Sequence, residues 1–157
     1  MDPTALLAPP IRPGTISELD RFADFWLAMF EENRNVAESD MVRDWRTRFR
    51  RYLERRILEN EARFFVAVEE GAIIGAAGAL VADGYPFVVH GIRRGYVFGV
   101  RVDPTRRKRG IATRLTQEAI AYLRGVGCGL VRLHASPFGR PIYERLGFRP
   151  TNEMELR

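Results

Sequence analysis

The sequence predicts a single α/β domain with a mixed central sheet of about six to seven strands and about four flanking helices. The length of 157 residues suits one domain with a sizeable core. Apolar residues recur with helical spacing in several stretches, and runs of aromatic and β-branched residues between glycines and prolines are typical of strands. No repeat or low-complexity linker interrupts the chain. Together these observations predict one folded α/β unit.

The start of the chain predicts a loose segment, a short strand and a helix. Residues 1–10 are rich in proline and are expected to be flexible, so the domain proper is expected over residues 11–157. A short strand is expected at residues 11–12. Thr15 or Ser17 can cap the helix that follows, and an apolar stripe along this helix predicts that one face is buried.

The rest of the chain predicts strands joined by glycine-rich turns, with further helices between them. Helices are expected over 41–60, from Gly110 to Arg124, and after Ser136, which can cap the last helix ahead of Pro141. Residues 87–94 fit either a strand or a loop. Strands are expected at 62–69, 72–81, 96–102, 130–135 and 148–156.

The stretch from Tyr96 to Leu115 organises the domain. Its first part, Tyr96–Val102, is an apolar strand that Asp103 and Pro104 end, because proline has no amide donor and restricts the preceding residue. Helical spacing resumes after Gly110, and the amides of the first helical turn have no partner within the helix. A bare turn and a helix N-terminus beside an arginine-rich run form a suitable cradle for a phosphate or diphosphate.

Two motifs in this half of the chain resemble those of the GNAT superfamily of N-acetyltransferases. The pattern Arg107-x-x-Gly110-x-Ala112 after a strand is similar to the family's loop for the acyl-CoA diphosphate. Residues 136–148, SPFGRPIYERLGF, are similar to the family's C-terminal motif. The first motif is weak alone, but the two occur in the family's order and about one strand apart. The resemblance covers residues 95–148, and the first half fits by length and element order only.

The resemblance implies an N-acetyltransferase that moves an acetyl group from acetyl-CoA to a primary amine by direct attack in a ternary complex. It implies a GNAT-like fold in which the fourth and fifth strands splay apart, with Gly99 as the site of a bulge and pantetheine in the gap. A main-chain N–H near Val100–Val102 is then expected to stabilise the oxyanion, which can be worth about 3 kcal/mol. The residues implied to bind acetyl-CoA are Val100, Arg101, Val102, Arg107, Lys108, Arg109, Gly110, Ile111, Ala112, Thr113, Ser136 and Gly139.

Tyr143 stands where the family often carries a general acid for the CoA thiolate. A thiolate with a pKa of about 8.5 gains from protonation, and a phenol with a pKa of about 10 can supply the proton. Packing against the CoA arm, or a hydrogen bond to its sulfur, is an equally good interpretation. Ser136 replaces a common Asn, so helix capping is favoured over pantetheine binding, and Gly139 in place of a common Ala is expected to change little.

The base and the amine acceptor are not defined by these motifs. The central strand carries no carboxylate, and His134 is a lone histidine of the kind that is more often structural, so no base is assigned and a water chain would also suffice. A small-molecule amine is favoured, and a peptide or protein amine stays open. Core packing is favoured for Trp26 and Phe30, and segments 31–40 and 83–93 are the expected pocket-lining loops.

The charge balance leaves two rival functions to weigh. The net charge is +5, and Lys108 is the one lysine among 25 basic residues, so the arginine bias pervades the chain. The basic helix over 41–60 could bind nucleic acid, but Asp44 and Glu54 interrupt its charge and aromatic residues do not alternate on its basic side. A solvated face is therefore favoured, and no nucleic-acid partner is expected. A non-catalytic acyl-CoA sensor or interaction domain is the main alternative.

Composition sets the remaining expectations. A hydrophobic fraction of 46% and a charged fraction of 29% are ordinary for a globular protein. The sequence has no run of about 18 apolar residues, so no membrane span is predicted, and no secretory signal is expected. The lone Cys128 predicts no internal disulfide, and the Cys and His spacing predicts no metal site. A cytoplasmic location is the default expectation, and the oligomeric state is open, with a homodimer as one option.

Overall fold

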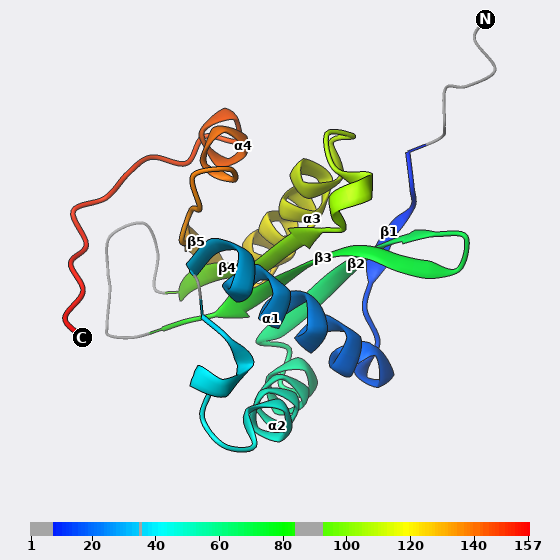
Figure 1. The fold of residues 1–157 in the computed structure, drawn as a ribbon. Coiled ribbons are helices and arrows are strands. Elements are labelled where there is room, and N and C mark those ends of the chain that lie inside the picture. The colour runs from blue at the N-terminus through cyan, green and yellow to red at the C-terminus, as the bar shows by residue number, and fades with distance from the viewer. Residues whose placement is uncertain (1–7, 35, 84–92) are drawn as a thin grey trace, which may run out of the picture.

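A sheet of five strands in the order β1-β2-β3-β4-β5 forms the centre of the protein in the computed structural model, which describes residues 8–34, 36–83 and 93–157 (Figure 1). Neighbouring strands from β1 to β4 run antiparallel, and β5 runs parallel to β4. The sheet is therefore mixed, as the sequence predicts. The strands are β1 (Ile11–Pro13), β2 (Ala62–Glu69), β3 (Ala72–Val81), β4 (Arg93–Val102) and β5 (Cys128–Arg132).

Helices cover both faces of the sheet (Figure 1). On one face Phe22 of α1 stacks on Phe64 of β2, with ring centroids 4.9 Å apart, and on the other face Leu115 and Leu123 of α3 are fully buried. The packing of apolar stripes on the two faces explains why these helices form where helical spacing predicts them. The helices are α1 (Leu19–Arg34), α2 (Trp45–Leu58), α3 (Ile111–Gly125) and α4 (Arg140–Arg145).

A bulge in β4 turns the second half of this strand. Phe98 pairs with Gly78 and Arg101 pairs with Ala76, so Gly99 and the residue after it oppose one residue of β3. Gly99 has φ +62°, a left-handed conformation that glycine adopts without strain. The bulge predicted at Gly99 is confirmed, and it directs the Arg101 side chain toward α1.

The fourth and fifth strands separate after Tyr96, ahead of the bulge at Gly99. Their parallel pairing joins Arg93–Tyr96 to Cys128–Arg132 and extends no further along the described part of β4. The rest of β4 continues to Val102 beside β3 alone. The predicted splay between the fourth and fifth strands is therefore confirmed, and the gap leaves strand amides and carbonyls of β4 without a β5 partner.

The sequence overestimates the number of strands. The strand predicted at 148–156 does not form: residues 149–157 are exposed and irregular, and their tie to the sheet is an Arg132–Glu153 ion pair of 3.6 Å. A strand needs a hydrogen-bonded neighbour, and apolar alternation does not supply one. The described residues thus form five strands in place of six or seven, and the strand predicted at 130–135 runs from Cys128 to Arg132.

Smaller differences concern the second helix and the start of the chain. Helix α2 begins at Trp45, because Asp44 has φ 60° and cannot continue a right-handed helix, so the helix predicted from residue 41 starts four residues late. The main chain of Pro10 already accepts a hydrogen bond from the Val68 amide at 3.0 Å. The expected flexible residues 1–7, and most of the expected loop at 83–93, lie outside the described residues.

No helix in the described part of the chain combines the length and the apolar character that a membrane crossing requires.

Candidate active site

A groove of about 510 Å³ runs from the start of α3 to α4. It is called the α3 groove below. All but one of the residues that the sequence assigns to acetyl-CoA binding line it, the exception being Arg109. The groove is lined by Glu32, Asn33, Val100, Arg101, Val102, Arg106, Arg107, Lys108, Gly110, Ile111, Ala112, Thr113, Ser136, Phe138, Gly139, Ile142, Tyr143 and Arg145.

The N-terminus of α3 presents main-chain donors to this groove. Gly110 precedes the helix with φ 72° and no side chain caps the first turn. The amides of Ile111, Ala112 and Thr113 have no partner within the helix, and they lie at the positive end of the helix dipole. A Cβ on Gly110 would meet no atom within 4 Å, so this approach is open. Such an uncapped helix start favours an anion.

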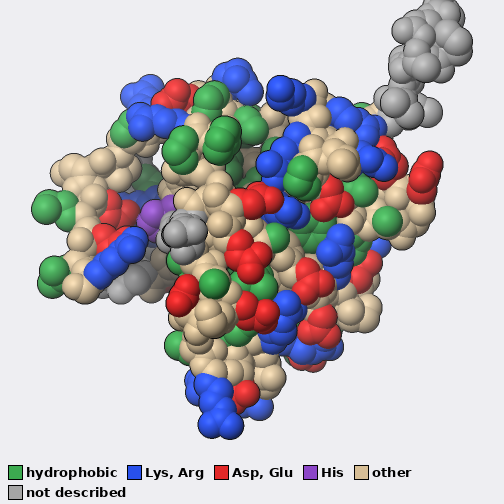
Figure 2. Space-filling model, viewed as in Figure 1, with side chains coloured by type: hydrophobic (Ala, Val, Ile, Leu, Met, Phe, Trp, Pro, Cys, Tyr) green, Lys and Arg blue, Asp and Glu red, His purple; other side chains and the backbone are tan. Residues whose placement is uncertain are grey.

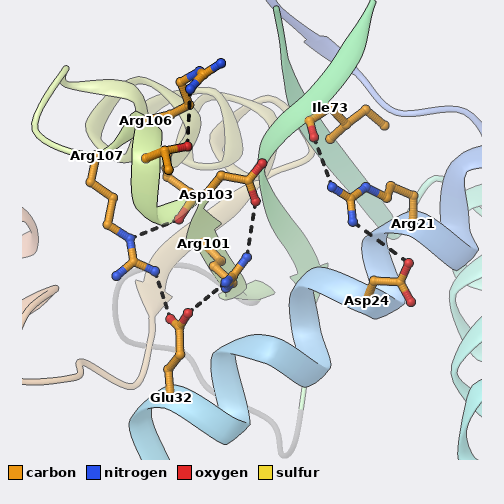
Figure 3. Close-up of polar contacts among 10 residues, drawn as sticks. Arg21, Asp24, Glu32, Ile73, Arg101, Asp103, Arg106 and Arg107 are labelled. Carbon is orange, nitrogen blue, oxygen red and sulfur yellow. Dashed lines mark hydrogen bonds and ion pairs between the residues drawn. The ribbon is translucent and has the colours of Figure 1, made fainter.

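Glu32 ties the end of α1 to β4 and to the turn before α3 (Figure 3). Its two carboxylate oxygens accept hydrogen bonds from Arg101 at 2.7 Å and from Arg107 at 2.8 Å. Burial opposes ionisation of Glu32, but the two guanidinium groups outweigh it and lower the pKa of this carboxyl. Arg107 also donates to the Val102 carbonyl at 3.0 Å. Arg107 therefore holds the turn in place, and its role toward a diphosphate stays a prediction.

Arg109 points away from the α3 groove. Its guanidinium donates to Glu69 of β2 at 2.9 Å, and Arg106 bonds the other oxygen of the same carboxylate. Hydrogen bonds from Arg106 and Arg109 lower the pKa of Glu69. The structure thus gives Arg109 a partner on β2, and it does not bring this side chain together with the other predicted binding residues.

Tyr143 lies on α4 at the inner end of the groove. Its side chain is 8% exposed, and burial raises the pKa of its phenol to about 12. A Cβ on Gly139 would come within 2.9 Å of the Tyr143 ring, so glycine at this position makes room for that ring. An alanine at this position would require the Tyr143 ring to shift, and the expectation that the glycine changes little stays a prediction. Ser136 Oγ accepts a hydrogen bond from the Gly139 amide at 3.0 Å, which closes the turn before α4. The helix itself begins at Arg140 with Gly139 at its N-cap position and no side-chain cap, so Ser136 is not the N-cap residue that the sequence predicts.

A second cavity of about 480 Å³, called the aromatic pocket below, lies between α1, α2 and the opened strands. Trp26 and Phe30 line it, and their rings are 4.7 Å apart, so these two residues do more than fill the core. The pocket is lined by Trp26, Met29, Phe30, Asn33, Phe49, Tyr52, Leu53, Leu80, Tyr96, Val97, Phe98, Gly99, Val100, Leu133, His134, Ala135, Ser136, Pro137 and Tyr143.

Several of these pocket residues escape prediction from the sequence. Phe49, Tyr52 and Leu53 come from α2, and Leu80 comes from β3. Their apolar spacing is that of an ordinary buried stripe, so it carries no signal for a pocket. Only the placement of α2 against the open end of the sheet distinguishes them from core residues.

The α3 groove and the aromatic pocket meet. Asn33, Val100, Ser136 and Tyr143 line both cavities. Val100 belongs to the bulge in β4, and Tyr143 faces the gap from α4. Two ligands, one in each cavity, would therefore contact each other at the gap between the fourth and fifth strands.

One titratable nitrogen lies on the pocket wall in the described residues. His134 Nδ1 is in hydrogen-bond contact with the Tyr96 hydroxyl, and both side chains line the aromatic pocket. No group of three or more His, Cys, Asp or Glu side chains that could hold a metal ion occurs within residues 8–34, 36–83 and 93–157.

The opened sheet, the uncapped helix start and the two joined cavities define an acyltransferase domain. Comparison with protein families gives the same class: residues 20–148 match the model of the acetyltransferase (GNAT) family. The chain belongs to this family.

Two solved structures share the fold over almost the whole chain. A GCN5-related N-acetyltransferase from Ralstonia eutropha JMP134 is 31% identical with a TM-score of 0.83, and the match covers 94% of this chain and 97% of that one. A predicted acetyltransferase from Clostridium acetobutylicum, solved with acetyl-CoA, is 23% identical with a TM-score of 0.83, covering 94% and 95%. The second likeness concerns the fold alone.

Two curated relatives match over part of their length. Glucosamine 6-phosphate N-acetyltransferase of Trypanosoma brucei brucei is 33% identical over 87 residues, which are 55% of this chain and 57% of the relative. Mycothiol acetyltransferase of Amycolatopsis mediterranei is 33% identical over 98 residues, which are 60% of this chain and 33% of the relative. The chain thus spans about half or less of the curated relatives it matches.

Proposed function

We propose that the protein is an N-acetyltransferase that moves an acetyl group from acetyl-CoA to the primary amine of a small molecule. The observation that carries this proposal is the junction of the α3 groove and the aromatic pocket at Val100 and Tyr143. Such a junction lets a thioester in one cavity meet an amine in the other. Bringing the two reactants together in this way lowers the entropic part of the barrier.

The α3 groove fits the polar parts of acetyl-CoA. The free amides at the start of α3 suit its diphosphate, and Lys108 on the same turn is exposed. The gap beside β4 offers strand groups that suit the amides of pantetheine. The presence of acetyl-CoA in the Clostridium acetobutylicum structure supports the same ligand here.

Acetyl transfer needs two groups at the junction: one that stabilises the oxyanion and one that protonates the leaving thiolate. When the amine nitrogen bonds to the thioester carbon, negative charge develops on the carbonyl oxygen, and a main-chain N–H near Val100 would stabilise it. When the carbon–sulfur bond then breaks, the leaving thiolate takes a proton, and we assign its donation to Tyr143, which lines the junction. Burial raises the pKa of Tyr143 to about 12, so the phenol is protonated at neutral pH. The same shift makes it a weaker acid than an ordinary tyrosine toward a thiolate with a pKa of about 8.5.

Small-molecule acceptors are favoured by the relatives as well as by the pocket. One relative is named for glucosamine 6-phosphate and the other for mycothiol. A cavity of about 480 Å³ is within the size range of small-molecule sites.

Calorimetry and a thiol-release assay test the proposal together. The protein is titrated with acetyl-CoA, and a panel of small amines is then screened for release of free CoA thiol. We expect saturable heat with acetyl-CoA and thiol release above the amine-free rate with at least one amine. Heat without thiol release from any amine would favour a non-catalytic acyl-CoA sensor. Absence of heat would overturn both functions.

A further inference from the structure

The aromatic pocket and the α3 groove differ sharply in charge. Glu32, Lys108 and four arginines line the α3 groove. In contrast, no Asp, Glu, Lys or Arg is among the described residues that line the aromatic pocket. Its polar groups are neutral hydroxyls, the Asn33 amide and the His134 ring. The described lining of the aromatic pocket therefore offers no full counter-charge to a charged substituent. A smaller adjoining cavity shares Leu133, His134, Ala135 and Tyr143 with the pocket, and its charged lining residues are Arg132, Arg140, Glu144, Arg149 and Glu153.

Three carboxylates of α1 form ion pairs outside this pocket. On α1, Asp20 pairs with Arg50 at 2.9 Å and Asp24 pairs with Arg46 at 2.8 Å, which ties α1 to α2 on their exposed sides. Glu32 is held by two arginines on the groove side. None of these three carboxylates lines the aromatic pocket, so they do not form an anchor for a second ammonium group there.

Aromatic and aliphatic side chains together supply most of the described wall. Trp26 lies 4.7 Å from Phe30 and 5.0 Å from Phe49 between ring centroids, and the three side chains belong to α1 and α2. Leu80 and Phe98 extend this surface across β3 and β4. A ligand with an apolar body binds such a wall favourably, because its apolar surface is removed from water. A phosphate or a polycation would find no charged partner on this wall, and burial of an unpaired charge is costly.

We propose that the acceptor is a primary amine carried by an uncharged, apolar body, such as an alkylamine or an arylalkylamine. This inference rests on the proposed function, because it names the substrate class of the same site. The amine nitrogen lies at the junction with Tyr143, and the apolar body lies against Trp26, Phe30 and Phe49. Substrates with a phosphate or several ammonium groups, such as glucosamine 6-phosphate and aminoglycosides, are poorly matched to this pocket.

A homologous series of amines tests the inference on the unmodified protein. Thiol release is measured with the linear amines from propylamine to hexylamine, with phenethylamine, with glucosamine 6-phosphate and with kanamycin. We expect kcat/KM to rise about fourfold for each added methylene, the factor that corresponds to burying one CH₂ group. We expect the two charged acceptors to fall below hexylamine by about a hundredfold or more, since their charges would be buried unpaired.

Matched variants locate the effect in the pocket. Met29→Glu places a carboxylate on the pocket wall, and Met154→Glu makes the same change at a side chain that is 94% exposed and lines neither cavity. We expect Met29→Glu to lower kcat/KM for hexylamine about tenfold or more, with the Kd for acetyl-CoA unchanged. Tyr52→Glu, at a rim position that is 43% exposed, should act in the same direction and tolerates a charge more easily.

The outcomes separate this inference from the proposed function. Thiol release with glucosamine 6-phosphate or kanamycin at least as efficient as with hexylamine would overturn the inference and leave the N-acetyltransferase proposal intact. A flat alkylamine series, or equal activity of Met29→Glu, Tyr52→Glu and Met154→Glu, would do the same. Binding of acetyl-CoA without thiol release from any of these amines would overturn the proposed function and the inference with it.

Discussion

Tyr143 is the side chain on which the proposed chemistry depends most directly. It lines the α3 groove and the aromatic pocket, and its ring occupies space that a side chain at position 139 would take. Burial raises the pKa of its phenol to about 12. A raised pKa favours the protonated form, so a donor is available over the alkaline range in which an alkyl amine loses its own proton.

Replacing Tyr143 by Phe tests whether this phenol acts as an acid. Because the ring is kept and only the hydroxyl is lost, packing against Phe148 and Gly139 should persist. We expect kcat to fall about a hundredfold, within the range for general acid catalysis, with the Kd for acetyl-CoA unchanged. Steady-state kinetics and calorimetry measure the two quantities. An unchanged kcat would show that Tyr143 packs or bonds the sulfur without donating a proton.

The N-terminus of α3 is the element that the diphosphate proposal requires. Thr113 is the third residue of this helix and lines the groove. An aspartate at this position would face the site with a negative charge, and an asparagine would have nearly the same shape without the charge. We expect Thr113→Asp to weaken acetyl-CoA binding about tenfold and Thr113→Asn to leave it nearly unchanged, as calorimetry can measure.

Stability provides the control for this pair, because the charge acts on the helix in the opposite direction. A carboxylate in the first turn of a helix is favourable, by about 0.3–1 kcal/mol. Thr113→Asp should therefore unfold at a temperature no lower than Thr113→Asn while binding acetyl-CoA less tightly. Equal binding by the two variants would show that no anion lies at this helix start.

The sequence predicts an element well when a single residue, such as a proline or a glycine, determines the local backbone conformation. The turn between β4 and α3 follows from Pro104 and Gly110, and the bulge follows from Gly99, because each depends on the conformational limits of a single residue. The strand predicted at 148–156 fails for the opposite reason. The apolar and polar residues of this segment alternate as in a strand, but a strand forms only beside a partner with which it can exchange hydrogen bonds. The segment's own sequence does not show whether such a partner is present, and residues 149–157 are irregular.

At the scale of the whole molecule, the two halves of the site differ in how far the sequence reveals them. The α3 groove is built largely from two contiguous motifs, so a resemblance within residues 95–148 is enough to predict it. The aromatic pocket takes residues from α1, α2, β3 and β4, which meet only in the folded chain. Charged side chains of α1 and α2 form ion pairs outside this pocket, as Arg46 and Asp24 do.

Acidic and basic side chains are intermixed over the surface, as Figure 2 shows for one face. Several carboxylates are held ionised by arginines, and their pKa values are lowered: hydrogen bonds from Arg12 lower that of Glu18 to about 2, and arginines also lower those of Glu32 and Glu69. A lowered pKa in the folded state stabilises the fold above the ordinary carboxyl pKa, and this stabilisation is lost as the pH falls through the folded value.

Acid unfolding of the whole domain should therefore depend on Glu18. Its carboxylate bonds Arg12 at 2.7 Å and the Thr15 amide at 2.9 Å, which joins β1 to the start of α1. We expect Glu18→Gln to lower the free energy of unfolding by about 1 kcal/mol at pH 7, and the gap to wild type to close between pH 4.5 and about 2. Urea titrations across this range measure both proteins, with Glu118→Gln on the exposed side of α3 as the control. A gap that persists unchanged to pH 2 would show that the charge of Glu18 does not contribute to the stability of the fold.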